Sequence, residues 1–172
     1  MDFKKLANQY RDELLDNVLP FWLEHSQDLE FGGYFSCLDR EGKVFDTDKF
    51  IWLQGREVWM FSMLYNKVEK RQEWLDCAVQ GGEFLKKYGH DGNYNWYFSL
   101  DRSGRPLVEP YNIFSYTFAT MAFGQLSLAT GNQEYADIAK KTFKIILSKV
   151  DNPKSKWNKL HPGTRNLKNF AL

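Results

Sequence analysis

Two stretches of the chain have nearly the same sequence, and they constrain its fold more than any other feature. Residues 32–44 read "GGYFSCLDREGKV" and residues 95–107 read "NWYFSLDRSGRPL". Each places Asp-Arg-x-Gly between aromatic and apolar residues, which is typical of a β-hairpin whose turn glycine adopts a left-handed conformation. We interpret the shared aspartate, arginine and glycine as turn residues rather than catalytic residues.

Helical periodicity flanks the first of these hairpins on both sides. Apolar residues recur at helical spacing over residues 3–25, where Pro20 is expected to kink the helix near its end. After the hairpin, Asp48 can cap a second helix that we expect to run from about residue 49 to residue 69. The first unit is therefore helix, hairpin, helix.

The same order recurs around the second hairpin. A helix is predicted over residues 72–88, and another over residues 111–129 that ends at Gly131. A third unit begins with a helix over residues 133–150, continues through a polar loop and starts a further helix near Arg165. The chain thus contains about three helix pairs.

Repeated helix pairs of this length predict a mainly all-α fold in which the pairs close into an (α/α) barrel. The second helix of each pair is expected inside, because it is apolar on nearly every face, whereas the first helices have polar faces. We expect residues 1–172 to form one partial barrel that is truncated in its sixth helix, as a fragment of a longer protein. The alternative is an obligate dimer that closes the ring between two chains, since a half-barrel would expose a large apolar surface.

The composition excludes several classes of partner. The chain has 23 Lys and Arg residues against 22 Asp and Glu residues, so no charge excess favours nucleic acid or an anionic membrane. Its two cysteines, Cys37 and Cys77, lack the spacing of a zinc site or a disulfide framework. Neither a signal peptide nor a membrane-spanning segment is evident, and the simplest location is the cytoplasm.

Aromatic residues make up 17% of the chain, a surplus that can fill a core or line a sugar site. On one predicted inner helix, Trp52, Arg56 and Trp59 share a face at i, i+4 and i+7. An arginine there is either part of a buried network or exposed to a pocket, and its cost of burial favours a pocket. On the next inner helix, Tyr111 begins a face of hydroxyls and rings whose simpler interpretation is core.

No pattern of known catalytic chemistry is evident in the sequence. It lacks a phosphate-binding loop, a dinucleotide-binding glycine pattern and a zinc-protease motif, so neither a cofactor nor a metal is predicted. The carboxylates Asp46 and Asp48 suit turns and caps better than a glycosidase pair. We expect His25 and His90 to be structural, whereas His161 precedes an inner helix and could face the mouth of the barrel.

Four segments together give the chain a family resemblance. These are "FWLEHSQDLEFGGYFSCLDREGKV", "FIWLQGREVWMFSMLY", "EPYNIFSYTFA" and "HPGTRNLKNFAL". They resemble the N-terminal half of the N-acylglucosamine 2-epimerases, also called renin-binding proteins, whose superfamily includes cellobiose 2-epimerases and aldose–ketose isomerases. The resemblance covers essentially the whole chain and implies an (α/α)6 barrel with a central pocket.

The resemblance also implies a function and a set of site residues. It implies interconversion of N-acetylglucosamine and N-acetylmannosamine by removal and return of the C2 proton, without a cofactor. Arg56 matches the family arginine that stabilises the enolate, and Trp52, Gln54, Tyr111 and Lys168 are expected to bind the sugar. The family's acid–base histidines come from later helices, so this chain alone is expected to be inactive.

Other interpretations of the chain remain open. A cellobiose 2-epimerase or an aldose–ketose isomerase would share the hairpin and the arginine. A non-catalytic module that binds a sugar or a protein is a further alternative. The resemblance also suggests a homodimer.

Overall fold

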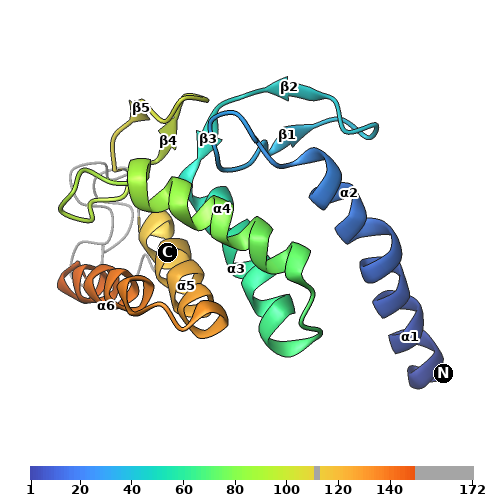
Figure 1. The fold of residues 1–172 in the computed structure, drawn as a ribbon. Helices are drawn as coiled ribbons and strands as arrows, with labels where there is room; N and C mark the ends of the chain where they lie inside the picture. Colours follow the sequence, from blue (N-terminus) through green and yellow to red (C-terminus); the bar gives the residue numbers. More distant parts are fainter. Residues whose placement is uncertain (111–112, 150–172) are drawn as a thin grey trace, which may run out of the picture.

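The computed structural model describes residues 1–110 and 113–149 (Figure 1). Helices are the main elements, and short strands connect them, which confirms the mainly helical fold predicted from the sequence. The helical elements are α1 (Phe3–Glu13), η1 (Leu14–Val18), α2 (Leu19–His25), α3 (Ile51–Lys67), α4 (Gln72–Tyr88), α5 (Phe114–Thr130) and α6 (Gln133–Ser148). The strands are β1 (Cys37–Leu38), β2 (Val44–Asp46), β3 (Lys49–Phe50), β4 (Ser99–Leu100) and β5 (Pro106–Val108).

The first helix spans residues 3–25, as its periodicity predicted, but it changes geometry along the way. The segment η1 is one π-helical turn, and Pro20 follows it at the start of α2. Proline has no amide hydrogen to donate to the carbonyl four residues earlier, so regular α-helical bonding cannot continue through it. Figure 1 shows this helix extending away from α3, α4 and α5. Within it only Leu19 is buried.

Both predicted hairpins form, and their aspartate and glycine residues act in the turns as predicted, whereas the Arg102 side chain pairs with Asp28 and Glu30 outside its turn. In the first, β1 pairs with β2, the Asp39 carboxylate accepts hydrogen bonds from the amides of Glu41 and Lys43, and Gly42 has φ +83°. In the second, β4 pairs with β5, and Asp101 accepts a bond from the amide of Arg105. The repeated aspartate and glycine thus serve the turns.

The start of α3 differs from the prediction. Lys49 and Phe50 form β3, which pairs with β4 of the second hairpin and so creates a three-stranded sheet. The N-cap of α3 is Phe50, which caps it with no side-chain hydrogen bond, so the predicted cap at Asp48 is wrong. The amide of Asp48 instead donates to the Asp46 carboxylate at 2.8 Å. Lys49 and Phe50, which the sequence predicted to begin the helix, instead form a strand because they pair with residues about fifty positions later in the chain.

A buried charge cluster joins the two hairpin regions. The fully buried Lys49 ammonium donates to the Asp28 carboxylate at 2.9 Å and to the carbonyl oxygens of Gly32 and Arg102. The Arg102 guanidinium also donates to both Asp28 oxygens. Burial alone would raise the pKa of Asp28, but the hydrogen bonds from Arg102 and Lys49 lower it to about 2. Asp28 is therefore ionised, and both cations hold it in place.

The helices pack in the order expected of a barrel wall. Helix α3 packs against α4 and α5, and α5 packs against α6. The predicted inner helices α3 and α5 lie side by side. They are in close contact at Gly55, where an added Cβ would lie 3.0 Å from backbone and side-chain carbon atoms of Phe118. Large aromatic residues fill the core, as one interpretation of the aromatic surplus proposed. They include Tyr34, Phe61, Trp74, Trp96 and Phe123.

The remaining helix bounds lie close to the predictions. Helix α4 has the predicted bounds, and α6 ends at Ser148, two residues before the predicted end. Helix α5 begins at Phe114, three residues after the predicted start, and ends as expected at Gly131, whose φ is +72°. The helix predicted near Arg165 lies outside the described residues.

The buried cluster predicts that Lys49→Met destabilises the protein strongly. The change leaves the buried Asp28 carboxylate without one of its two cationic partners, and removing one member of a buried ion pair typically costs about 3 kcal/mol or more. Urea unfolding at pH 7 measures the difference. Lys43→Met, on the exposed first hairpin, is the matched control and should change the free energy of unfolding by less than about 0.5 kcal/mol. Equal effects of the two changes would contradict the role of the cluster.

A second prediction compares two helical glycines. Gly55→Ala should destabilise the protein by about 1 kcal/mol, because overpacking against the Phe118 backbone outweighs the gain in helix propensity. Gly124→Ala on α5 places its Cβ in open space and should stabilise the protein by about 0.5 to 1 kcal/mol. Thermal unfolding of both variants checks the opposite signs. A stabilising Gly55→Ala would show that α3 and α5 do not pack this closely.

Candidate functional site

Helix α3 presents two faces with different roles. Its buried face includes Gln54, Gly55 and Val58, which pack into the molecule. Arg56 lies on the other side and is exposed. Because successive helical residues are about 100° apart, one short motif supplies both the packing contacts and the exposed cation.

Aromatic rings hold the Arg56 guanidinium. Its central carbon lies 5.8 Å from the centre of the Trp52 ring and 5.4 Å from that of Phe118 on α5. The two rings lie 6.2 Å apart, so they form a platform beneath the cation. In residues 1–110 and 113–149, no carboxylate forms an ion pair with Arg56. The guanidinium is therefore positioned by rings while its N–H donors remain able to bind an oxygen ligand.

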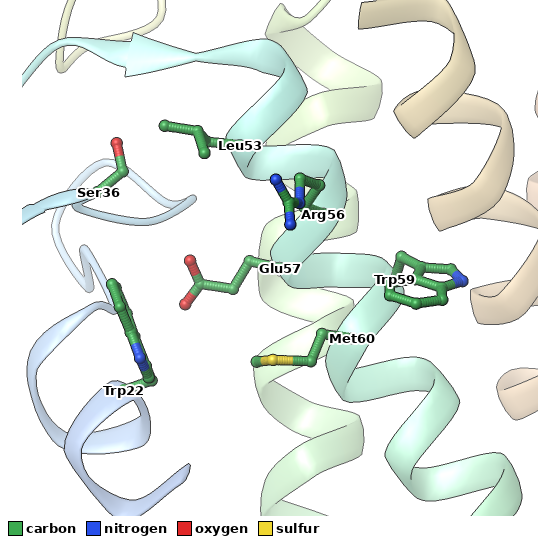
Figure 2. A pocket seen from close by; sticks show the side chains of 7 residues that line it. All are labelled: Trp22, Ser36, Leu53, Arg56, Glu57, Trp59 and Met60. Atoms are coloured by element: carbon green, nitrogen blue, oxygen red, sulfur yellow. The ribbon is translucent and has the colours of Figure 1, made fainter. Parts of the chain in front are cut away.

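A pocket of about 310 Å³ lies next to this arginine, between α2 and α3 (Figure 2). Most of its wall is aromatic or aliphatic, and the polar groups are a guanidinium, a carboxyl and a hydroxyl. The lining residues are Trp22, Ser36, Leu53, Arg56, Glu57, Trp59 and Met60. The Ser36 hydroxyl is buried and has no hydrogen-bond partner within the described part of the chain. An apolar wall with a few polar groups suits a polyol or another partly apolar ligand.

Glu57 is the pocket residue that sequence reasoning missed. Its carboxyl oxygen Oε1 hydrogen-bonds with the Ser26 hydroxyl at 2.5 Å. Burial raises the pKa of Glu57 to about 8, and this effect is larger than the opposing effect of the hydrogen bond with Ser26, which lowers the pKa. The signal in the sequence was the single carboxylate in the segment "FIWLQGREVWMFSMLY", which the sequence analysis did not consider.

Gln54 has a structural position in this chain. Its side chain is fully buried, its Oε1 accepts a bond from the Tyr34 amide, and its Nε2 donates to the Tyr34 carbonyl, both at 2.8 Å. These two hydrogen bonds tie α3 to the first hairpin region. The predicted contact between Gln54 and a sugar has no support in this geometry, because the side chain has no exposed atom to offer.

Of the other predicted site residues, the structure describes Trp52 only. Trp52 lies beside Arg56, as predicted, although it is not part of the pocket lining. Tyr111, Lys168 and His161 lie outside the described residues.

The two described histidines have structural surroundings, as expected. The His25 ring lies 4.9 Å from that of Phe21. The half-buried His90 stacks on Tyr94 at 4.6 Å, and its Nδ1 accepts a bond from the Gly92 amide. Within residues 1–110 and 113–149, no group of three or more His, Cys, Asp or Glu side chains could hold a metal ion.

Comparison with known proteins places the chain among sugar epimerases. The family model described as N-acylglucosamine 2-epimerase (GlcNAc 2-epimerase) matches residues 33–171. The chain is 47% identical over 128 residues to the N-acylglucosamine 2-epimerase of Mus musculus, which covers 72% of this chain and 30% of that protein. It is 30% identical over 148 residues to the cellobiose 2-epimerase of Dictyoglomus turgidum, which covers 85% of this chain and 38% of that protein. The chain thus spans about a third of the length of these relatives.

The fold agrees with the sequence comparison. The structure of the cellobiose 2-epimerase from Bacillus thermoamylovorans B4167 superimposes with a TM-score of 0.78 at 28% identity, over 91% of this chain and 43% of that one. The helix pairs described here are therefore part of the (α/α)6-barrel architecture that the family resemblance implied. On the extent of the family match and the identity to its members, this chain belongs to the N-acylglucosamine 2-epimerase family.

Proposed function

We propose that this chain is the N-terminal part of a carbohydrate 2-epimerase that interconverts N-acetylglucosamine and N-acetylmannosamine. The family match supports the reaction class, and the higher identity to N-acylglucosamine 2-epimerase than to cellobiose 2-epimerase supports the N-acyl sugar. The single observation that carries the site is the exposed Arg56 guanidinium, held on aromatic rings and unpaired with any described carboxylate.

The chemistry of C2 epimerisation explains what such an arginine would do. The open-chain sugar has an aldehyde whose carbonyl acidifies the neighbouring C2 proton. When a base removes that proton, negative charge develops on the carbonyl oxygen. A guanidinium within hydrogen-bond distance stabilises this enolate more than it stabilises the neutral aldehyde, so it lowers the barrier. Trp52 would hold Arg56 in place and offer its indole face to the sugar.

The acid–base pair of the reaction is assigned to a part of the protein beyond this chain. Two groups on opposite sides of C2, with pKa values near neutrality, are needed to remove and return the proton, and histidines suit this task. The rings of His25 and His90 are packed among other aromatic residues and lie outside the Arg56 pocket. We infer that residues 1–172 form about three helix pairs of the barrel.

The setting of the whole protein is part of the same proposal. The near balance of charge favours a neutral ligand such as a small sugar, and the family resemblance favours a homodimer. The cytoplasmic location expected from the sequence belongs to the same proposal. Among residues 1–110 and 113–149, no helix is long and apolar enough to cross a membrane.

A second candidate is a cellobiose 2-epimerase. The similarity to the Bacillus thermoamylovorans structure over 91% of this chain favours it, because the two chains share the fold that carries α3. Comparing the binding of N-acetylglucosamine with that of cellobiose separates the two candidates. Preferential binding of cellobiose would overturn the N-acyl sugar assignment while leaving the epimerase class intact.

The first prediction from this proposal concerns sugar binding. Arg56→Ala should weaken the binding of N-acetylmannosamine at least about tenfold, which corresponds to about 1.4 kcal/mol, because a charged hydrogen bond to the sugar oxygen is lost. Ligand-observed NMR titration of the 172-residue chain measures the effect. Arg40→Ala, in the exposed turn of the first hairpin, is the control and should leave binding unchanged. If the chain binds no sugar but binds a protein partner with an affinity that Arg56→Ala leaves unchanged, a non-catalytic module would be favoured instead.

The second prediction concerns turnover. The purified 172-residue chain should form no N-acetylmannosamine from N-acetylglucosamine, because it lacks the assigned acid–base pair. Chromatographic detection of the product after prolonged incubation provides the test. Measurable turnover that disappears in Arg56→Ala would contradict the assignment and require an acid–base pair within this chain.

A further inference from the structure

The Ser26 hydroxyl has two acceptors and only one hydrogen. Ser26 is fully buried at the end of α2, with its Oγ 2.6 Å from the Trp22 carbonyl oxygen and 2.5 Å from Glu57 Oε1 on α3. A serine hydroxyl can donate one hydrogen bond and accept others. If Glu57 were ionised, both neighbours could only accept, and one of the two contacts would lack a hydrogen. If Glu57 carries a proton, it donates to Ser26, which donates to Trp22, and both contacts are satisfied.

The groups around Glu57 give little support to a negative charge. Ser26 stands at the C-terminal end of α2, where the carbonyl groups present the negative end of the helix dipole. The titratable groups that face Glu57 from other elements are Tyr34, in the loop after α2, and Cys77, on α4. Burial raises the pKa of each, so both are neutral.

Among residues 1–110 and 113–149, Arg56 is the one cation in the lining of the pocket. Its guanidinium lies over the Trp52 and Phe118 rings, and it forms no ion pair with Glu57. The rest of the lining comprises uncharged side chains, so no described cation compensates a carboxylate at this position.

We propose that Glu57 is a protonated carboxylic acid at neutral pH and links α3 to α2 through a hydrogen-bond relay. In this relay the Glu57 O–H donates to Ser26 Oγ, and the Ser26 O–H donates to the Trp22 carbonyl oxygen. Loss of the proton breaks the relay and leaves an uncompensated charge on the half-buried Glu57 in the pocket wall. The contact between α2 and α3 is therefore sensitive to pH, and this property does not depend on sugar binding.

The direction of the pH effect follows from proton linkage. Burial places the pKa of Glu57 in the folded chain at about 8, above its ordinary value of 4.5. Between these two values the folded state holds a proton that the unfolded state has released, so stability falls as pH rises. The stabilising contribution of the protonated relay is complete below about pH 4.5 and is lost as pH rises through about 8.

The variant Glu57→Gln tests the relay, because a glutamine amide donates to Ser26 at every pH. The melting temperature of Glu57→Gln should match that of the unmodified chain at pH 5 and exceed it by at least about 4 °C at pH 8.5. Glu41→Gln, in the exposed turn of the first hairpin, is the matched control and should change neither value. If Glu57→Gln instead lowers the melting temperature equally at both pH values, Glu57 is an ionised acceptor and the proposal is wrong.

A second measurement does not require the variant to fold. In a carbon-13 NMR titration of the unmodified chain, one glutamate side-chain carboxyl carbon should titrate with a midpoint above pH 7. Titration of every glutamate carboxyl below about pH 6 would overturn the protonated relay. Its outcome is independent of the sugar-binding test, since no ligand is present.

Discussion

The cluster of the buried Asp28 and Lys49 with the partly exposed Arg102 is the interaction on which the arrangement of the other elements depends. Lys49 lies in β3, immediately before α3 begins, and its ammonium reaches groups from both hairpin regions. Because a buried carboxylate needs its cationic partners close by, the cluster allows few relative positions of the two repeat units. The direction in which α3 leaves the sheet, and so the position of Arg56, follows from this electrostatic constraint.

Helix α3 then holds the candidate site between two kinds of contact. On its buried side, Gln54 bonds to the Tyr34 backbone, and Gly55 permits the close approach of α5. On its open side, Arg56 rests on rings from α3 and α5. Since the same close packing brings Phe118 next to Arg56, the rigidity of the scaffold and the orientation of the cation have a common cause. A site built on packed helices in this way is held more firmly than one built on loops.

Much of the fold could be predicted from the sequence, because its elements depend on nearby residues. The helical spacing of apolar residues gave the bounds of α4, and the Asp-Arg-x-Gly turns gave both hairpins. The predicted start of α3 was wrong because β3 pairs with β4, about fifty residues away. A two-residue strand is too short to show an alternating hydrophobic pattern in the sequence. Of the site, Arg56 and its ring partner Trp52 followed from spacing on one helical face. Glu57 did not, since its surroundings come from α2 and the loop before β1.

By itself, the sequence determined the order of helices and turns, the family and the residue types on α3, since these follow from local spacing and motifs. Only the tertiary structure decided which polar groups of α3 are used by the fold and which are open to a ligand. Gln54 and Arg56 are two positions apart, yet Gln54 is buried and hydrogen-bonded to the Tyr34 backbone, whereas Arg56 is exposed. The physical reason is that burial, hydrogen-bond partners and protonation depend on groups that are distant in the chain and meet only when the helices pack.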